Sequence, residues 1–334
     1  KEKQMKTKNL SLLLATLLGA SLTACNSGAG SPTGKSTNQV NNTESVTTQE
    51  IIVGATDKNI GFVGTDNGDL EYYDNDKFIK IVHKFEDKVS KLYIANVQTD
   101  NITVYVATHS ENHELYINKC VLETATTAPT CNRIDTYDDV GADNPPYSSM
   151  FFDLYGNGYV MLGTTKSYFV DTDNNKYSRL GKYISNTLVW TKYIKETFLS
   201  DNKALESPQI LKDDNGVIQI AHYHGVASVD TNSNDLKASS VIQDTYGVFG
   251  IKSLDQYYNG FSLSYNNIYR IIDGHRVSAS LHKFIDEVSE MSTTNDSVYV
   301  VTKGKELKKC NYDGNCATID KFHDIPKAVA FQNF

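Results

Sequence analysis

Four of the five cysteines are spaced so that their thiols can pair as disulfides. Cys120 and Cys131 form a Cys-x10-Cys pair. Cys310 and Cys316 flank Asp313-Gly314, a dipeptide typical of tight hairpin turns. Four cysteines allow three pairings, and zinc binding is a further alternative, although neither spacing has the compact pattern of zinc ligands. Proximity in the chain favours two local disulfides, which persist in an oxidising compartment.

Other candidate ligands are sparse. His222 and His224 alternate along an apolar segment, so both imidazoles would lie on one face of a strand, where they could bind a metal. No third ligand accompanies them, so polar residues on an inner strand or its rim are the favoured interpretation. Asp171 to Asn175 resembles the start of a calcium loop but lacks its glycine and distal glutamate. We therefore predict no metal and no cofactor.

Motifs of catalysis are missing from the chain. It contains no Gly-x-Ser-x-Gly, no His-Glu-x-x-His and no dinucleotide fingerprint. Residues 29–36 match a loose phosphate-loop pattern, but no strand precedes them and no helix pattern follows, so the backbone would not cradle a phosphate. We predict no catalytic residues, and the chain is more consistent with binding than with enzymatic activity.

The fifth cysteine, Cys25, ends an apolar N-terminal segment. Lys6 and Lys8 precede the apolar run Leu10–Leu18, and Leu22-Thr23-Ala24-Cys25 follows it. A basic start, a short apolar stretch and small residues are typical of a secretory signal peptide. Leu-Thr-Ala-Cys resembles the bacterial lipobox, which implies cleavage before Cys25 and its modification by lipid, palmitate included. Asn26, in place of Asp, resembles the signal for a destination at the cell outer membrane.

These patterns divide the chain into three parts. Residues 1–24 are expected to be the lipoprotein signal peptide. Residues 25–49 are rich in Asn, Ser, Thr and Gly, so we expect a flexible tether from the lipidated cysteine to the folded part. Residues 50–334 form the expected domain. The formal net charge of −8 argues against nucleic-acid binding, which requires neutralisation of phosphates.

A short aromatic motif recurs through the expected domain. In each copy a Lys or Thr precedes a Phe or Tyr, and successive aromatics lie 38 to 63 residues apart. A period of this size indicates a repeat architecture. The six copies are Lys84-Phe85, Thr136-Tyr137, Lys182-Tyr183, Thr245-Tyr246, Lys283-Phe284 and Lys321-Phe322.

Each repeat predicts four short strands. An apolar strand lies upstream, a second strand often ends on an Asp turn, a third carries the aromatic, and a fourth, such as Lys91–Ala95 or Ala328–Phe331, closes the module. Repeated four-stranded sheets bury their faces by stacking around an axis. We therefore predict an all-β fold, a β-propeller of about six four-stranded blades with seven possible, preceded by the signal peptide and tether. Glu50–Ala55 could add a strand that helps to close the ring.

The candidate binding face follows from the departures from the repeat. In an up-and-down blade the turns after strands two and four emerge on one face, so we expect the Asp turns, both disulfide hairpins and the insert 196–216 to share a rim. The insert 138–147 would lie on the other rim. Loops on a rigid scaffold often carry function. The candidate residues are Glu196, Asp201, Asp213, Asp74, Asp171, Asp230 and Asp273.

Two classes of function remain open at this point. The first is a lipid-anchored platform in the cell envelope, periplasmic or surface-exposed, that binds a protein, peptide or glycan without catalysis. In layout it resembles the propeller lipoprotein of the outer-membrane assembly machinery, BamB, although the eight blades and Trp-rich repeats of that family are missing. The alternative is a propeller enzyme with a central-channel site, similar to lactonases, lyases or quinone dehydrogenases.

Overall fold

The structure is a computed structural model in which every regular element among the described residues is a β-strand. It describes residues 58–98, 101–123, 129–138, 147–163, 177–195, 209–212, 218–222, 225–230, 235–239, 251–254, 259–264, 266–273 and 275–333. The predicted signal peptide, the tether, Cys25 and Glu50–Ala55 all lie outside these residues. None of the described residues forms a helix with the length and apolarity that membrane crossing requires.

The strands form six antiparallel sheets, which we number as blades and describe from the innermost strand outward. Blade 1 contains β25 (Pro326–Asn333), β1 (Asn59–Thr65), β2 (Asp69–Asp74) and β3 (Lys77–Lys84). Blade 2 contains β4 (Lys88–Val97), β5 (Asn101–His109), β6 (Leu115–Glu123) and β7 (Thr130–Tyr137). Blade 3 contains β8 (Tyr147–Phe152), β9 (Gly158–Gly163), β10 (Tyr177–Ile184) and β11 (Thr187–Lys195).

The remaining blades follow the same order with one addition. Blade 4 contains β12 (Gln209–Lys212), β13 (Ile218–His222), β14 (Gly225–Asp230) and β15 (Asp235–Ser239). Blade 5 contains β16 (Ile251–Leu254), β17 (Gly260–Ser264), β18 (Asn267–Ile272), β19 (His275–Arg276) and β20 (His282–Lys283), of which the last two both pair with β18. Blade 6 contains β21 (Val288–Thr293), β22 (Ser297–Thr302), β23 (Glu306–Asn311) and β24 (Cys316–Lys321).

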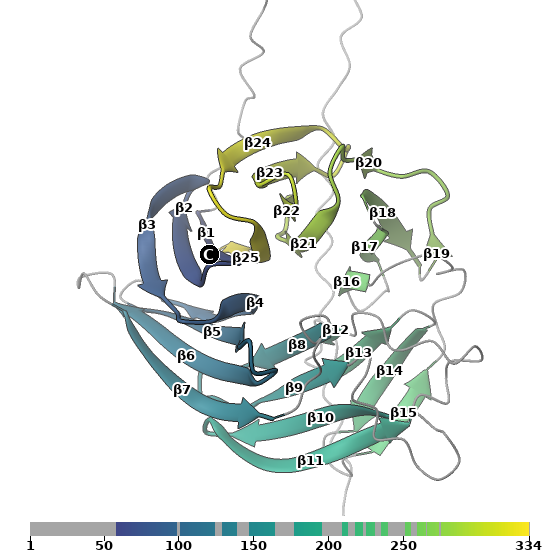
Figure 1. The fold of residues 1–334 in the computed structure, drawn as a ribbon. Helices are drawn as coiled ribbons and strands as arrows, with labels where there is room; N and C mark the ends of the chain where they lie inside the picture. The colour runs from purple at the N-terminus through teal and green to yellow at the C-terminus, as the bar shows by residue number, and fades with distance from the viewer. Residues whose placement is uncertain are drawn as a thin grey trace, which may run out of the picture. The chain divides into compact units, whose positions relative to one another are not determined.

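Contacts between innermost strands close the blades into a ring. β4 contacts β25, β8 contacts β4, β12 contacts β8, β16 contacts β12, β21 contacts β16, and β25 contacts β21. The blades accordingly follow one another around a common axis (Figure 1). The all-β class and the propeller arrangement are confirmed. Five of the six sheets have the predicted four strands, and blade 5 has five.

The predicted module boundary is displaced by one strand. Lys91–Ala95 was expected to close the first module, but it belongs to β4, which pairs with β5 and begins blade 2. Ala328–Phe331 belongs to β25, which pairs with β1 in blade 1. Strands from both ends of the described chain therefore complete one blade and close the ring. Local sequence marks a strand but not its partner, because hairpins within blades and connections between blades are similarly short.

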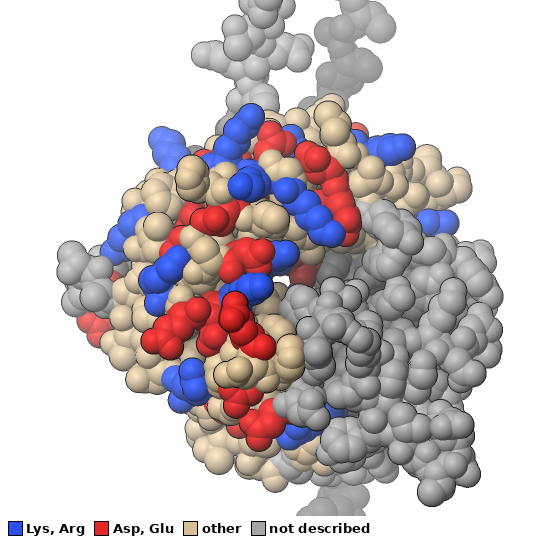
Figure 2. Space-filling view, in the orientation of Figure 1, with Lys and Arg blue, Asp and Glu red and all other residues tan. Residues whose placement is uncertain are grey.

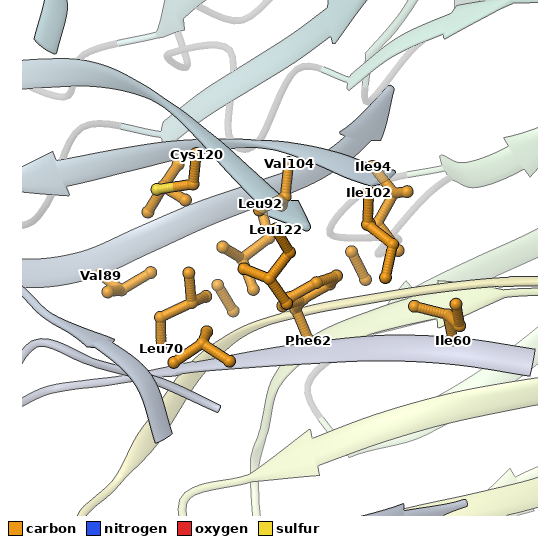
Figure 3. Packing of buried hydrophobic residues seen from close by; sticks show 14 residues of the cluster. Ile60, Phe62, Leu70, Val89, Leu92, Ile94, Ile102, Val104, Cys120 and Leu122 are labelled. Atoms are coloured by element: carbon orange, nitrogen blue, oxygen red, sulfur yellow. The ribbon is translucent and has the colours of Figure 1, made fainter. Parts of the chain in front are cut away.

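The hydrophobic core lies between neighbouring blades. Between blades 1 and 2, Phe62 and Leu70 pack against Val89, Leu92 and other apolar side chains of blade 2 (Figure 3). Further buried clusters join blades 2 and 3, 3 and 4, 5 and 6, and 6 and 1. A single sheet leaves an apolar face uncovered, so burial against the next blade stabilises the ring.

The repeated aromatic residues are part of this scaffold. Phe85, Phe284 and Phe322 each follow the outer part of a blade, and their N–H groups donate to Gly68 O, Asn266 O and Lys305 O at 2.8 to 2.9 Å. Each bond ties the connection between blades to the turn between the second and third strands. Lys182-Tyr183 is different, because it lies on β10, the third strand of blade 3. Its alignment with the other copies was wrong.

Candidate binding surface and the seams that support it

Two sets of turns occupy one rim of the propeller, which we call the turn rim. They are the turns between first and second strands and between third and fourth strands, with residues 75–76, 153–157, 185–186, 273, 294–296 and 312–315 among those described. Hydrogen bonds join the two sets: Asn186 N–H donates to Gly156 O at 2.8 Å, and Asp273 N–H donates to Asn259 Oδ1 at 2.9 Å. The opposite rim, the connection rim, carries residues 66–68, 85–87, 110–114, 284–287, 303–305 and 322–325.

Left-handed backbone makes the hairpin turns of the turn rim tight. Asn75 and Asp76 have φ values of 49° and 63°, and Ser185 and Asn186 have 50° and 64°. Two consecutive left-handed residues are typical of the two-residue turn that matches the twist of β-hairpins. Asn and Asp tolerate this conformation better than most residues. The predicted turns at Asp74 and Asp273 are therefore hairpin turns on this rim.

The other predicted binding-face residues are only partly described. Asp230 is the last residue of β14, while Asp171, Glu196, Asp201 and Asp213 lie outside the described residues. The expected insert 196–216 contains a strand, β12. The rest of this insert and residues 139–146 of the other insert lie outside the described residues, so the placement of the two inserts on opposite rims stays a prediction.

Large apolar side chains are exposed beside the tight turns. Phe78 and Ile79 follow the turn of blade 1, Ile184 precedes the turn of blade 3, and Ile272 precedes Asp273 in blade 5. Their side chains leave 44 to 49% of their surface accessible. Exposed apolar residues that gather in one place mark interaction sites more often than residues scattered singly do. The turn rim is therefore the candidate binding surface.

Blade 3 has the most pronounced apolar group. Leu154 and Tyr155 lie in the turn 153–157, and Tyr155 is 70% exposed. The bond from Asn186 N–H to Gly156 O brings this turn against the hairpin that follows Ile184. Leu154, Tyr155 and Ile184 were not among the residues predicted from the sequence. Their sequence signal was an apolar pair, Leu154-Tyr155, inside a turn that otherwise consists of Asp, Gly and Asn.

The predicted disulfides are confirmed. Cys120 bonds Cys131 and Cys310 bonds Cys316, each pair directly opposite on the third and fourth strands of its blade. Blades 2 and 6 therefore have stapled hairpins where blades 1, 3 and 5 have tight or Asp-bearing turns. Blade 2 packs against blade 3, and blade 6 packs against blade 1. Each blade with a stapled hairpin therefore packs against a blade with a tight turn.

An ion pair crosses the inner strands near the axis. Lys91 Nζ of β4 lies 2.5 Å from Glu290 Oε2 of β21, and both side chains are largely buried. Charged residues of both signs also lie beside the central opening, on the coloured part of the face seen in Figure 2. Among the described residues no three His, Cys, Asp or Glu side chains come together as metal ligands would. His109 and His113 have ring centroids 6.4 Å apart on the connection rim.

A row of three residues supports each tight turn of blades 1 and 3. Phe331, Gly61 and Tyr73 lie opposite one another on the first three strands of blade 1. Phe152, Gly158 and Tyr183 form the same row in blade 3. The glycine leaves room for the phenylalanine ring, since a Cβ at Gly61 would lie 2.1 Å from Phe331 Cε1. This register defines which residues of the two blades are equivalent.

A tyrosine from the preceding blade stacks on each row and reaches the turn. Tyr299 of blade 6 stacks on Phe331 at 3.8 Å between centroids, and its hydroxyl donates to Asp76 Oδ1 at 2.7 Å. Tyr105 of blade 2 stacks on Phe152 at 3.9 Å and donates to Asn186 Oδ1 at 2.6 Å. Burial raises the pKa of Tyr105 to about 12, so the phenol stays protonated and remains a donor.

Comparisons with known proteins show similarity of fold only. No protein-family model matches the chain, and no curated protein matches its sequence. Solved structures that are similar include Sqt1 of Saccharomyces cerevisiae, with 10% identity, a TM-score of 0.42 and coverage of 79% of this chain and 72% of that chain. The computationally designed Ika8 protein has 11% identity, a TM-score of 0.38 and coverage of 82% and 88%. At these scores the similarities carry no argument about function.

Proposed function

We propose that this chain is a lipid-anchored β-propeller of the cell envelope that serves as a non-catalytic binding platform for a protein partner. The observation that carries the proposal is the exposed apolar group of blade 3, Leu154, Tyr155 and Ile184, beside two turns that a hydrogen bond joins. Tyrosine and large aliphatic side chains contribute strongly to protein interfaces when a partner buries them. A peptide would use the same surface, whereas a glycan would require more polar groups than Leu154, Tyr155 and Ile184 offer.

The rigidity of the turn rim supports this role. In blades 1 and 3 the apolar group lies beside a hairpin that a buried tyrosine of the preceding blade holds in place. A surface that is ordered before binding loses less conformational entropy when the partner docks. The propeller would thus present its apolar side chains in a constant arrangement.

Site-specific photo-crosslinking in the producing cells tests the binding role. A photoreactive residue at position 155 or 184 is expected to yield discrete crosslinked proteins that are absent with the same residue at position 285. Ile285 is the matched control, because it is a fully exposed apolar side chain on the connection rim. The same crosslinks from all three positions, or none from positions 155 and 184, would contradict a platform on the turn rim.

Lipid anchoring requires a separate test. Cells fed labelled palmitate are expected to label the protein, and Cys25→Ser is expected to abolish the label and release the protein from membranes. Cys310→Ser is the control, since Cys310 pairs with Cys316 and should not accept lipid. Unchanged labelling of the Cys25→Ser variant would refute the anchor and leave the turn-rim proposal in place.

A further inference from the structure

The hydroxyl of Tyr73 lies between two carboxyl groups at the contact of blades 6 and 1. Its oxygen is 3.0 Å from Glu71 Oε2 on the same strand and 2.9 Å from Asp320 Oδ2 on β24. A phenol has one proton and can donate it to only one carboxylate. Both contacts are hydrogen bonds only when one carboxyl carries a proton and donates it to the phenol oxygen.

At the equivalent position between blades 2 and 3, the tyrosine hydroxyl contacts one carboxyl group and a second phenol. Tyr183 donates to Asp135 Oδ2 of β7, and the hydroxyl of Tyr137 contacts that of Tyr183. Tyr137 thus supplies the proton that a protonated Glu71 supplies at the other contact. The residue equivalent to Glu71 is Gly181, and a Cβ there would lie 2.6 Å from Tyr137 Oη. The hydroxyl of Tyr137 therefore occupies the space that the Glu71 side chain occupies at the other contact.

The charges around Glu71 favour its neutral form. Burial is the main cause that raises the pKa of Glu71 to about 7; the hydrogen bond with Tyr73 opposes it, and the charges of Asp320 and Asp69 raise the pKa further. On the paired strands Glu71 faces Val63 of β1 and Ile81 of β3. The nearby lysines bind other acids: Lys84 binds Asp69, and Lys308 and Lys321 bind Glu306.

We propose that the contact between blades 6 and 1 is a pH-sensitive latch, closed while Glu71 donates a hydrogen bond through Tyr73 to Asp320 and weakened when Glu71 loses its proton. The ionised form places two carboxylates about one phenol, with a single proton between them. Like charges so close, in a partly buried site, repel each other. The contact between blades 2 and 3 has a phenol in the same role and remains closed throughout this pH range. This latch is independent of the platform proposed above.

The direction of the pH effect follows from linkage. In the unfolded chain Glu71 ionises near its ordinary pKa of 4.5, whereas in the folded protein it keeps its proton to about pH 7. Between these values unfolding releases a proton, so the stability of the protein falls as pH rises and levels off above pH 7. Below pH 4.5 both states are protonated and the stabilisation is complete.

The variant Glu71→Gln tests the latch in the full chain. The amide N–H donates to Tyr73 at every pH, so the variant should match the wild type in Tm at pH 5 and exceed it by about 2–6 °C at pH 8. In the wild type, the ¹³C shift of the Glu71 carboxyl should titrate with a midpoint near pH 7. Protection factors for amide exchange, which correct for the intrinsic rate at each pH, should fall in β2 and β24 above that midpoint and stay constant in β7 and β10.

Glu306→Gln is the control variant. Glu306 lies on β23 beside the same contact, but hydrogen bonds and charges from Lys308 and Lys321 lower its pKa below its ordinary value. Its substitution should leave the Tm difference between pH 5 and pH 8 as in the wild type. A Glu71→Gln variant with an unchanged pH dependence, or a Glu71 carboxyl that titrates near pH 4.5, would overturn the proposal.

Discussion

The contact between blades 2 and 3 and the contact between blades 6 and 1 use one plan with different chemistry. In both, a tyrosine stacks on a Phe–Gly–Tyr row of the next blade and bonds its hairpin turn. Between blades 2 and 3 the hydroxyl of the stacked tyrosine donates to a neutral acceptor, Asn186. Between blades 6 and 1 it donates to Asp76, which Lys309 also binds at 2.7 Å. The first uses a phenol as proton donor where the second uses Glu71. The scaffold therefore tolerates a change from neutral to ionisable groups as long as the ring stacking is kept.

The largest expected effect comes from removal of the stacked phenylalanine. Phe152→Ala and Phe331→Ala should each lower the free energy of unfolding by about 3–5 kcal/mol, because each ring is buried between two tyrosines. Urea denaturation measures the change, and Phe78→Ala, at an exposed ring, should cost under about 1 kcal/mol. A much smaller loss for one of the two buried rings would show that the contacts are not equivalent.

Reduction of the disulfides should have the next largest effect. The bonds close loops with sequence separations of 11 and 6 residues. Loop entropy then predicts a stabilisation of about 3 kcal/mol for Cys120–Cys131 and about 2 kcal/mol for Cys310–Cys316. Denaturation with and without reductant, in variants that keep only one pair, separates the two. Equal losses would argue against loop entropy as the cause of the difference.

The smallest effect should distinguish the two proton donors. Tyr137→Phe removes the hydroxyl that contacts Tyr183 and should cost about 1 kcal/mol. The loss should be the same at pH 5 and pH 8, because the phenol does not ionise in this range: burial raises the pKa of Tyr137. Thermal unfolding at both pH values checks this. A loss that depends on pH would contradict the phenol of Tyr137 as the proton donor at this contact.

Much of the scaffold could be predicted from residues close in the chain. The cysteine pairs, the Asp turns and the strand segments all depend on local spacing and propensity. The alignment of Lys182-Tyr183 with the other aromatic copies failed, because the dipeptide is the same while its strand partner is different. Tyr183 lies opposite Gly158, as Tyr73 lies opposite Gly61, and only the sheet register shows this equivalence.

The candidate site was less accessible to sequence reasoning. The longest insertion, residues 196–216, stands out in the sequence, whereas Leu154-Tyr155 does not, because single apolar residues in turns are common. Their significance depends on Ile184 and its hairpin, which backbone hydrogen bonds bring beside them. Exposure is a property of the folded surface, so no local pattern could have ranked these residues above the inserts.

The sequence by itself determined the repeat, the strands and the hairpins that disulfides staple, because these depend on residues within a few tens of positions. The tertiary structure decided which strands share a blade and what Glu71 does. Asp320 is separated from Tyr73 by 247 positions, and the two meet only because β25 returns to pair with β1 and closes the ring. Burial and a second carboxyl then raise the pKa of Glu71, on an interior strand of blade 1, to about 7.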